Sequence, residues 1–167
     1  MALDKYRKSF NYEIITPTGL VAKGLAVSVS LPAEDGQIGI LGGRSPLATE
    51  IGAGLLHAQK TDGMHEEYFI AGGFAQVRED WLTILAEQCL PLEWIDPRQV
   101  YAELDRARQM PKDTPAAAEL RAQAVATARK KFNLAQEFHR GGQEGPAWRR
   151  IGGSRQSKEG NCPKECG

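Results

Sequence analysis

The first ninety residues alternate between apolar and polar side chains with the period of two that β-strands show. Aromatic and β-branched residues predict strands over residues 10–16, 68–71 and 81–85. Asp62-Gly63 and Arg78-Glu79-Asp80 mark tight turns. Many short strands without a long helical interlude predict an antiparallel β-sandwich, with a barrel as the alternative. A further strand is expected to bury Leu25, Val27, Val29 and Leu31 on one face, with Ala26, Ser28 and Ser30 on the other.

The pattern changes to a helical period at Asp96, which is an N-cap residue followed by proline. A first helix is expected to end near Met110, before Pro111, and Thr114-Pro115 starts a second that ends near His139. Two helices joined by so short a turn form an antiparallel hairpin. The chain therefore divides into a β-sandwich domain (1–92), an α-helical hairpin (93–139) and a Gly-rich tail (140–167) that we expect to be disordered.

Composition limits the classes of function. The 167 residues carry 21 basic and 21 acidic side chains, so the net charge of zero excludes a broad surface for nucleic acid. No apolar run approaches the roughly 20 residues that span a bilayer. We expect a soluble, cytoplasmic chain.

The sequence contains few groups with the spacing that catalysis or metal binding requires. His57 and His65 could meet on paired strands, but the histidines are otherwise scattered, and no base accompanies a nucleophile. Cys89 is interpreted as a small core residue, and Cys162 and Cys166 lack a second pair of ligands for zinc. We therefore assign no catalytic, cofactor-binding or metal-binding residue.

A basic cluster occupies the second predicted helix. Its apolar stripe is mostly alanine, which buries little area, so we expect the helix to dock weakly. Weak docking suits a switch between two positions and equally suits an ordinary appendage. The cluster is either a solvated face or a contact surface. It comprises Arg121, Arg129, Lys130 and Lys131, and the stripe comprises Leu120, Ala124, Ala128, Phe132, Ala135 and Phe138.

Several motifs, in order and at the right spacing, resemble those of the epsilon subunit of F-type ATP synthases. The central one is the Gly-rich run Leu31 to Leu47, which contains Gly36-Gln37-Ile38-Gly39-Ile40 and Ser45-Pro46-Leu47. Others are Ile51 to Gly54, Tyr68 to Val77, Leu82 to Glu87 and Ile95-Asp96 at the start of the hairpin. The resemblance covers about residues 10–138.

The resemblance implies a non-catalytic subunit of the central rotor stalk, without a cofactor. In that family the sandwich binds the gamma subunit and stands on the c-ring, which couples proton translocation to ATP synthesis. Glu34, Asp35, Gly36 and Gln37 match the loop that meets the c-ring, and Arg44 occupies the place of a family histidine. These positions are polar and turn-rich, as an exposed contact loop requires.

The resemblance also implies a regulatory role for the hairpin, which in the family restrains ATP hydrolysis when it extends into the catalytic head. By analogy, Arg121, Arg129, Lys130 and Lys131 would face acidic residues of the catalytic alpha and beta subunits. The expected location is the cytoplasmic face of a bacterial inner membrane. The chain would be peripheral there and held only through the complex.

Five residues depart from the family pattern. Gly42, Arg44 and Ala53 replace proline, histidine and proline. Some members sense ATP through a motif in which Arg and Ala stand where this chain has Gln99 and Val100. Loss of that Arg removes the partner for a phosphate, so we do not expect ATP sensing. The alternatives are a stand-alone nucleotide-sensing module and an enzyme with a hidden site.

Overall fold

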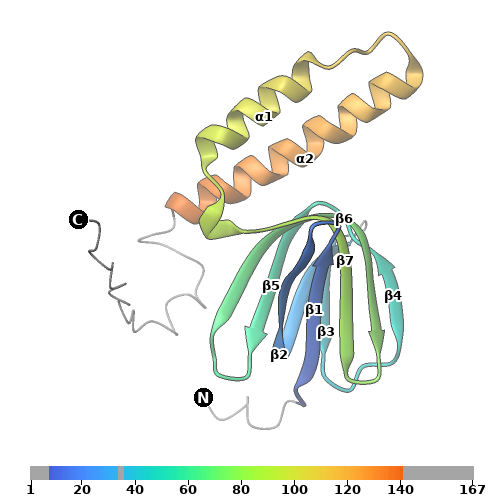
Figure 1. Cartoon of the computed structure of the whole chain (residues 1–167), viewed down its shortest axis with the longest axis vertical. Coiled ribbons are helices and arrows are strands. Elements are labelled where there is room, and N and C mark those ends of the chain that lie inside the picture. Colours follow the sequence, from blue (N-terminus) through green and yellow to red (C-terminus); the bar gives the residue numbers. More distant parts are fainter. Residues whose placement is uncertain (1–7, 34–35, 141–167) are drawn as a thin grey trace, which may run out of the picture.

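Seven strands and two helices make up the computed structural model, which describes residues 8–33 and 36–140 (Figure 1). A single turn of 3-10 helix, η2 (Leu92–Trp94), joins the strands to the helices. The helices are α1 (Pro97–Gln109) and α2 (Pro115–Arg140). The strands are β1 (Phe10–Thr16), β2 (Gly19–Ala33), β3 (Gly36–Leu41), β4 (Leu47–Glu50), β5 (Gly54–Lys60), β6 (His65–Arg78) and β7 (Trp81–Pro91).

The strands pair in the order β1-β7-β6-β5-β2, and β2 also pairs with β1, so the hydrogen-bonded path closes on itself. The short strands β3 and β4 pair with the long strands β2 and β6. The β1–β7 pair is parallel, and every other pairing among the named strands is antiparallel. The predicted β-sandwich followed by a helical hairpin is confirmed. Closure of the path leaves few free edges and makes the sandwich stiff.

The inward residues of β2 differ from the prediction at one end. Val27, Val29 and Leu31 are buried as expected, whereas Leu25 is exposed and Ala26 is buried instead. The pairing of β2 with β5 shifts register between Ala26 and Ser28, and such an irregularity exchanges the two faces of a strand. The simple alternation of the sequence does not reveal this shift.

The hairpin begins and ends where the sequence signals predict. The Asp96 carboxylate accepts a hydrogen bond of 2.9 Å from the backbone N–H of Arg98, and the Thr114 hydroxyl accepts one of 3.2 Å from that of Ala117. Both side chains thus satisfy amides that lack a partner within the helix. Proline follows each cap at the first helical position.

The hairpin lies across one end of the sandwich, with α2 between α1 and the strands (Figure 1). The contact forms a second small core, separate from that of the sandwich. Of the predicted stripe, Ala128 and Ala135 are buried and Leu120 is exposed. The second core comprises Phe69, Ala71, Leu92, Ile95, Val100 and Ala135, with Phe132, Leu134 and Phe138 packed against it. The docked area is therefore limited to the last turns of α2.

Candidate functional site: a cleft and two surfaces

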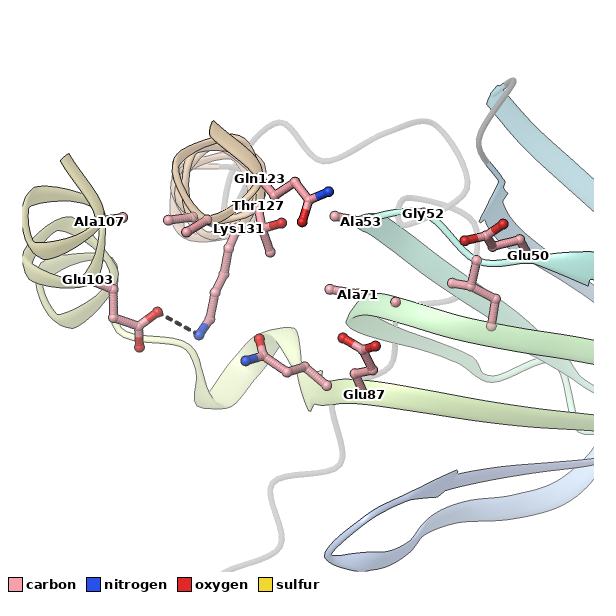
Figure 2. Close-up of a pocket in the computed structure, with 15 residues that line it drawn as sticks. Glu50, Gly52, Ala53, Ala71, Glu87, Glu103, Ala107, Gln123, Thr127 and Lys131 are labelled. Carbon is pink, nitrogen blue, oxygen red and sulfur yellow. Dashed lines mark hydrogen bonds and ion pairs between the residues drawn. The ribbon is translucent and has the colours of Figure 1, made fainter. Parts of the chain in front are cut away.

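A cleft of about 570 Å³ separates the hairpin from the sandwich (Figure 2). The side chains on both walls are small, so they leave the space between hairpin and sandwich unfilled. Ala124 and Ala128 of α2 face Gly52, Ala53 and Ala71 of the sandwich. The remaining lining residues are Glu50, Ile51, Gly72, Glu87, Gln88, Glu103, Ala107, Gln123, Thr127 and Lys131.

An ion pair inside the cleft joins the two helices above the sandwich. Lys131 Nζ of α2 is 2.9 Å from Glu103 Oε2 of α1, and the Lys131 side chain is only 9% exposed. The same ammonium lies 5.8 Å from the centre of the Phe69 ring in β6. One side chain therefore touches α1, α2 and the sandwich, which is an arrangement suited to holding the hairpin down.

Two further carboxylates lie on the sandwich wall of the cleft. Figure 2 shows those of Glu50 and Glu87 turned toward the space between sandwich and hairpin. Within residues 8–33 and 36–140, neither of them takes part in an ion pair. A side chain at Gly72 would come within 2.7 Å of the Glu87 carboxyl carbon, so the glycine leaves this carboxylate its place. The cleft thus carries excess negative charge.

The structure separates the four predicted basic residues. Arg129 and Lys130 are exposed on α2. Arg121 donates two hydrogen bonds, of 3.0 and 2.8 Å, to the carbonyl oxygen of Arg108 at the end of α1. Lys131 lies in the cleft, as described above. In this docked arrangement only part of the cluster is available to another protein.

Three of the five residues predicted to contact other rotor subunits, Gly36, Gln37 and Arg44, lie in the described part of the chain. Glu34 and Asp35 lie outside the described residues. Gly36 and Gln37 begin β3, and Arg44 follows its end, where its guanidinium reaches back to the carbonyl oxygen of Gly39. Gln37 accepts a hydrogen bond of 3.0 Å from the hydroxyl of Ser30. The described members of the set therefore occupy the two ends of one exposed strand.

An apolar row, which the sequence analysis missed, crosses the outer face of the sandwich. Phe74 pairs with Leu85, Leu85 with Ile15, and Ile15 with Leu20, so these side chains lie on one face across β6, β7, β1 and β2. Phe74, Leu85 and Leu20 are 62%, 52% and 61% exposed. Adjoining large apolar side chains left in water are typical of a protein contact surface. We call these four residues the apolar row.

His57 and His65, the two histidines that could meet on paired strands, lie side by side. The rings stack with centroids 5.0 Å apart, and His57 Nε2 lies 3.0 Å from His65 Nδ1. Burial, and then the neighbouring His65, lower the pKa of His57. The pair lies on β5 and β6, away from the cleft residues.

On the inner side of the same strands, Glu66 joins three partners. It accepts hydrogen bonds of 2.6 Å from Tyr12 and 3.0 Å from Tyr68, and it pairs with Lys60. Burial acts to raise the pKa of Glu66, but the bonds from Lys60, Tyr12 and Tyr68 outweigh it and leave the pKa low. Burial also raises the pKa of both tyrosines. This network braces β1 against the β5–β6 hairpin.

Among the described residues, no three His, Cys, Asp or Glu side chains are grouped to hold a metal ion. Cys162 and Cys166 fall outside the described ranges. Cys89 is buried in the sandwich core, and burial raises the pKa of its thiol to about 12, so it is a core residue as predicted. Within the same described part of the chain, no helix has the length and apolar character to cross a bilayer.

The fold and these surfaces define a class of protein: a stiff β-sandwich with an exposed apolar row, joined to a lightly docked helical hairpin. The family model of the ATP synthase delta/epsilon chain β-sandwich domain matches residues 9–91. The chain is 35% identical to the ATP synthase epsilon chain of Rhodopirellula baltica over 116 residues, which covers 70% of this chain and 90% of that one. It is 31% identical to the epsilon chain of Brucella canis over 106 residues, or 64% of this chain and 78% of that one. The chain therefore belongs to the family of ATP synthase epsilon chains.

Solved structures share the fold at lower identity. One is a chain of the mitochondrial ATP synthase of Euglena gracilis, with a TM-score of 0.62 and 20% identity over 71% of this chain and 76% of that one. Another is a chain in the central stalk and c-ring structure of the Tetrahymena thermophila mitochondrial ATP synthase. Its TM-score is 0.56 at 16% identity, and the match covers 75% of this chain and 98% of that one. These similarities cover a larger share of the chain than the sandwich family model, which spans residues 9–91.

Proposed function

We propose that the chain is the epsilon subunit in the central rotor stalk of an F-type ATP synthase. In this role its sandwich binds the gamma subunit and stands on the c-ring, so that ion translocation through the ring is coupled to ATP synthesis in the catalytic head. The chain itself performs no chemistry. It is held at the cytoplasmic face of a bacterial inner membrane through these partners alone.

The observation that carries this proposal is the apolar row on the closed sandwich. Torque passes between subunits only through a contact that neither deforms nor slips. The closed strand path supplies stiffness, and Phe74, Leu85 and Leu20 supply an exposed apolar anchor for a large partner such as gamma. Membership in the epsilon family makes gamma the partner to test.

The proposed c-ring contact lies on the β2–β3 side of the sandwich. Glu34, Asp35, Gly36, Gln37 and Arg44 are its proposed residues, on the basis of the family resemblance. The exposed positions of Gly36, Gln37 and Arg44 support this assignment. Arg44 adds positive charge where relatives carry histidine, which favours an acidic or carbonyl-rich partner surface.

The hairpin is the proposed regulator of hydrolysis. Its small contact with the sandwich is compatible with release, since two positions exchange only when their free energies differ by a few kcal/mol. After release, Arg121, Arg129, Lys130 and Lys131 would be accessible around α2 to the catalytic subunits. Release would take the Lys131 ammonium off the Phe69 ring of the sandwich and expose it to a carboxylate of the partner, so docking on the sandwich and inhibition would exclude each other.

Substitution in the apolar row tests the rotor role. Phe74→Asp places a charge in the proposed interface, and Gln76→Asp is the matched control two residues along the same face of β6. Loss of a central aromatic anchor of about 2 kcal/mol weakens binding roughly 30-fold. In membrane vesicles carrying the complete enzyme, we expect Phe74→Asp to reduce gradient-driven ATP synthesis and Gln76→Asp to preserve it. Equal activity of the two variants would contradict the proposal.

Deletion of residues 96–167 tests the regulatory role. The sandwich and its gamma contact lie outside the deleted segment, so synthesis should persist while ATP hydrolysis rises. The rate of hydrolysis by the purified complex is the measurement. An unchanged rate would show that the hairpin does not restrain this enzyme.

A further inference from the structure

We infer that the cleft between hairpin and sandwich is a docking site for the basic, apolar segment Trp148-Arg149-Arg150-Ile151 of this same chain. The inference goes beyond the rotor role and does not depend on it. It rests on the charge and shape of the cleft, the composition of the segment and the length of chain that joins them.

The cleft selects a cationic occupant. Glu50 and Glu87 line its sandwich wall and have no ion pair within the described ranges, while Glu103 is already held by Lys131. Three carboxylates against one ammonium leave an excess of negative charge in a partly enclosed space. Such a space strengthens attraction to a guanidinium, which binds carboxylates through two parallel hydrogen bonds.

The cleft also accepts apolar groups. Ala53 and Ala71 line it on the sandwich side (Figure 2), and Ala124 and Ala128 line it from α2, so the space between them is not filled. Its volume of about 570 Å³ lies in the range of pockets that hold small ligands, so a few side chains fit. An occupant that combines large apolar side chains with positive charge matches both walls.

The chain contains such a segment after Arg140. Residues 141–167 carry five basic and three acidic side chains, and their only large apolar residues are Trp148 and Ile151. Arg149 and Arg150 stand between these two. The segment therefore concentrates the charge and the apolar surface that the cleft lacks.

The connection is long enough. Thr127 in the cleft lies thirteen residues before Arg140, which is about 20 Å along the axis of α2. The seven residues from Gly141 to Ala147 span up to about 23 Å when extended. The connection starts with two glycines, and glycine allows the backbone more conformations than any other residue. This length is sufficient for Trp148 to reach the cleft if the chain reverses after α2.

A bound segment would touch the hairpin and the sandwich at once. It would hold α2 in the docked position and oppose its release. Its attachment to the same chain supplies a high effective concentration, so modest contacts suffice.

Amide chemical shifts of the full-length chain test this docking. Arg149→Glu with Arg150→Glu should move the amide resonances of Gly52, Ala53 and Gly72, because each lost guanidinium–carboxylate pair lowers the docked population about 2- to 5-fold. The matched control is Arg155→Glu with Lys158→Glu, which changes the net charge equally outside the segment. The control should leave those three resonances in place.

Substitution of Glu50 and Glu87 changes the surroundings of Gly52 and Gly72 directly, so the indole N–H resonance of Trp148 is the readout for these variants. Glu50→Arg with Glu87→Arg, added to the first variant, should return the Trp148 indole resonance toward its wild-type position. If the reversed sandwich charges disturb the fold, Glu50→Gln with Glu87→Gln alone should move the Trp148 indole resonance as the first variant does. The inference is overturned if the three resonances stay in place in the first variant, or move equally in the control. It is also overturned if they depend on chain concentration, because the occupant would then belong to a second copy.

Discussion

The two partners of the Lys131–Glu103 ion pair differ in their exposure to solvent, and this difference allows a test of hairpin docking. The Lys131 side chain is 9% exposed, and that of Glu103 is 48% exposed. Removal of one partner costs most when the remaining charge stays buried, about 3–5 kcal/mol in a fully buried pair. We therefore expect loss of the carboxylate to cost more than loss of the ammonium.

The structure sets the expected sizes. Glu103→Gln leaves the Lys131 ammonium buried with a neutral acceptor, and loss of a charge-assisted bond costs about 1.5–3 kcal/mol. Lys131→Met keeps an apolar stem of similar length against Phe69 and leaves Glu103 to water. Its cost should be about 0.5–1 kcal/mol, the size of the lost interaction with the Phe69 ring.

Native-state hydrogen exchange at the amide of Ala135 in α2 measures this free energy. The Ala135 side chain packs in the docked core, and a helix that loses its tertiary packing frays in water, which frees its amides to exchange. Glu119→Gln, at an exposed position of α2, is the control and should leave the exchange rate unchanged. Equal costs for Lys131→Met and Glu103→Gln, or a larger cost for Lys131→Met, would refute the reasoning.

Three further predictions follow from the sandwich. The pKa of His57 is lowered, so the folded chain binds fewer protons there, and its stability should fall as the pH drops below about 6.5; His57→Gln should flatten this slope in urea denaturation. The pKa of Glu66 is also lowered, so its carboxylate stabilises the fold at pH values above 4.5, the usual pKa of the group. The greater stability of the wild-type chain over Glu66→Gln should therefore vanish as the pH falls below 4.5. Gly73→Ala would place a methyl group 1.9 Å from a carbonyl oxygen of the facing strand, at a φ of 110°, and should cost about 2–4 kcal/mol, whereas Gly39→Ala meets open space and should cost much less.

Local signals in the sequence predicted the helices well. A cap followed by proline fixes a helix start within one or two residues, and both starts depend only on neighbours in the chain. The turn at Asp62-Gly63 was equally local, and Gly63 has the positive φ of 82° that such a turn requires. In β2, alternation also identified Val27, Val29 and Leu31 as inward residues.

Features that depend on distant residues could not be predicted in this way. The exposed position of Leu25 follows from the pairing of β2 with β5, and the burial of Lys131 follows from the docking of α2 on α1 and Phe69. Helical spacing alone placed Lys131 among exposed basic neighbours. The apolar row and the cleft were missed for the same reason, since each is assembled from several elements. The sequence contained one signal for the apolar row. Phe74 and Leu85 are next to the inward residues Ala75 and Ile84, so strand alternation places both on the outer face.

Binding of the purified chain to purified gamma subunit tests the central claim most directly. Titration in a calorimeter, with gel filtration of the mixture, should give a one-to-one complex that Phe74→Asp weakens roughly 30-fold and Gln76→Asp leaves intact. Absence of a complex with wild-type chain would contradict the assignment to the rotor.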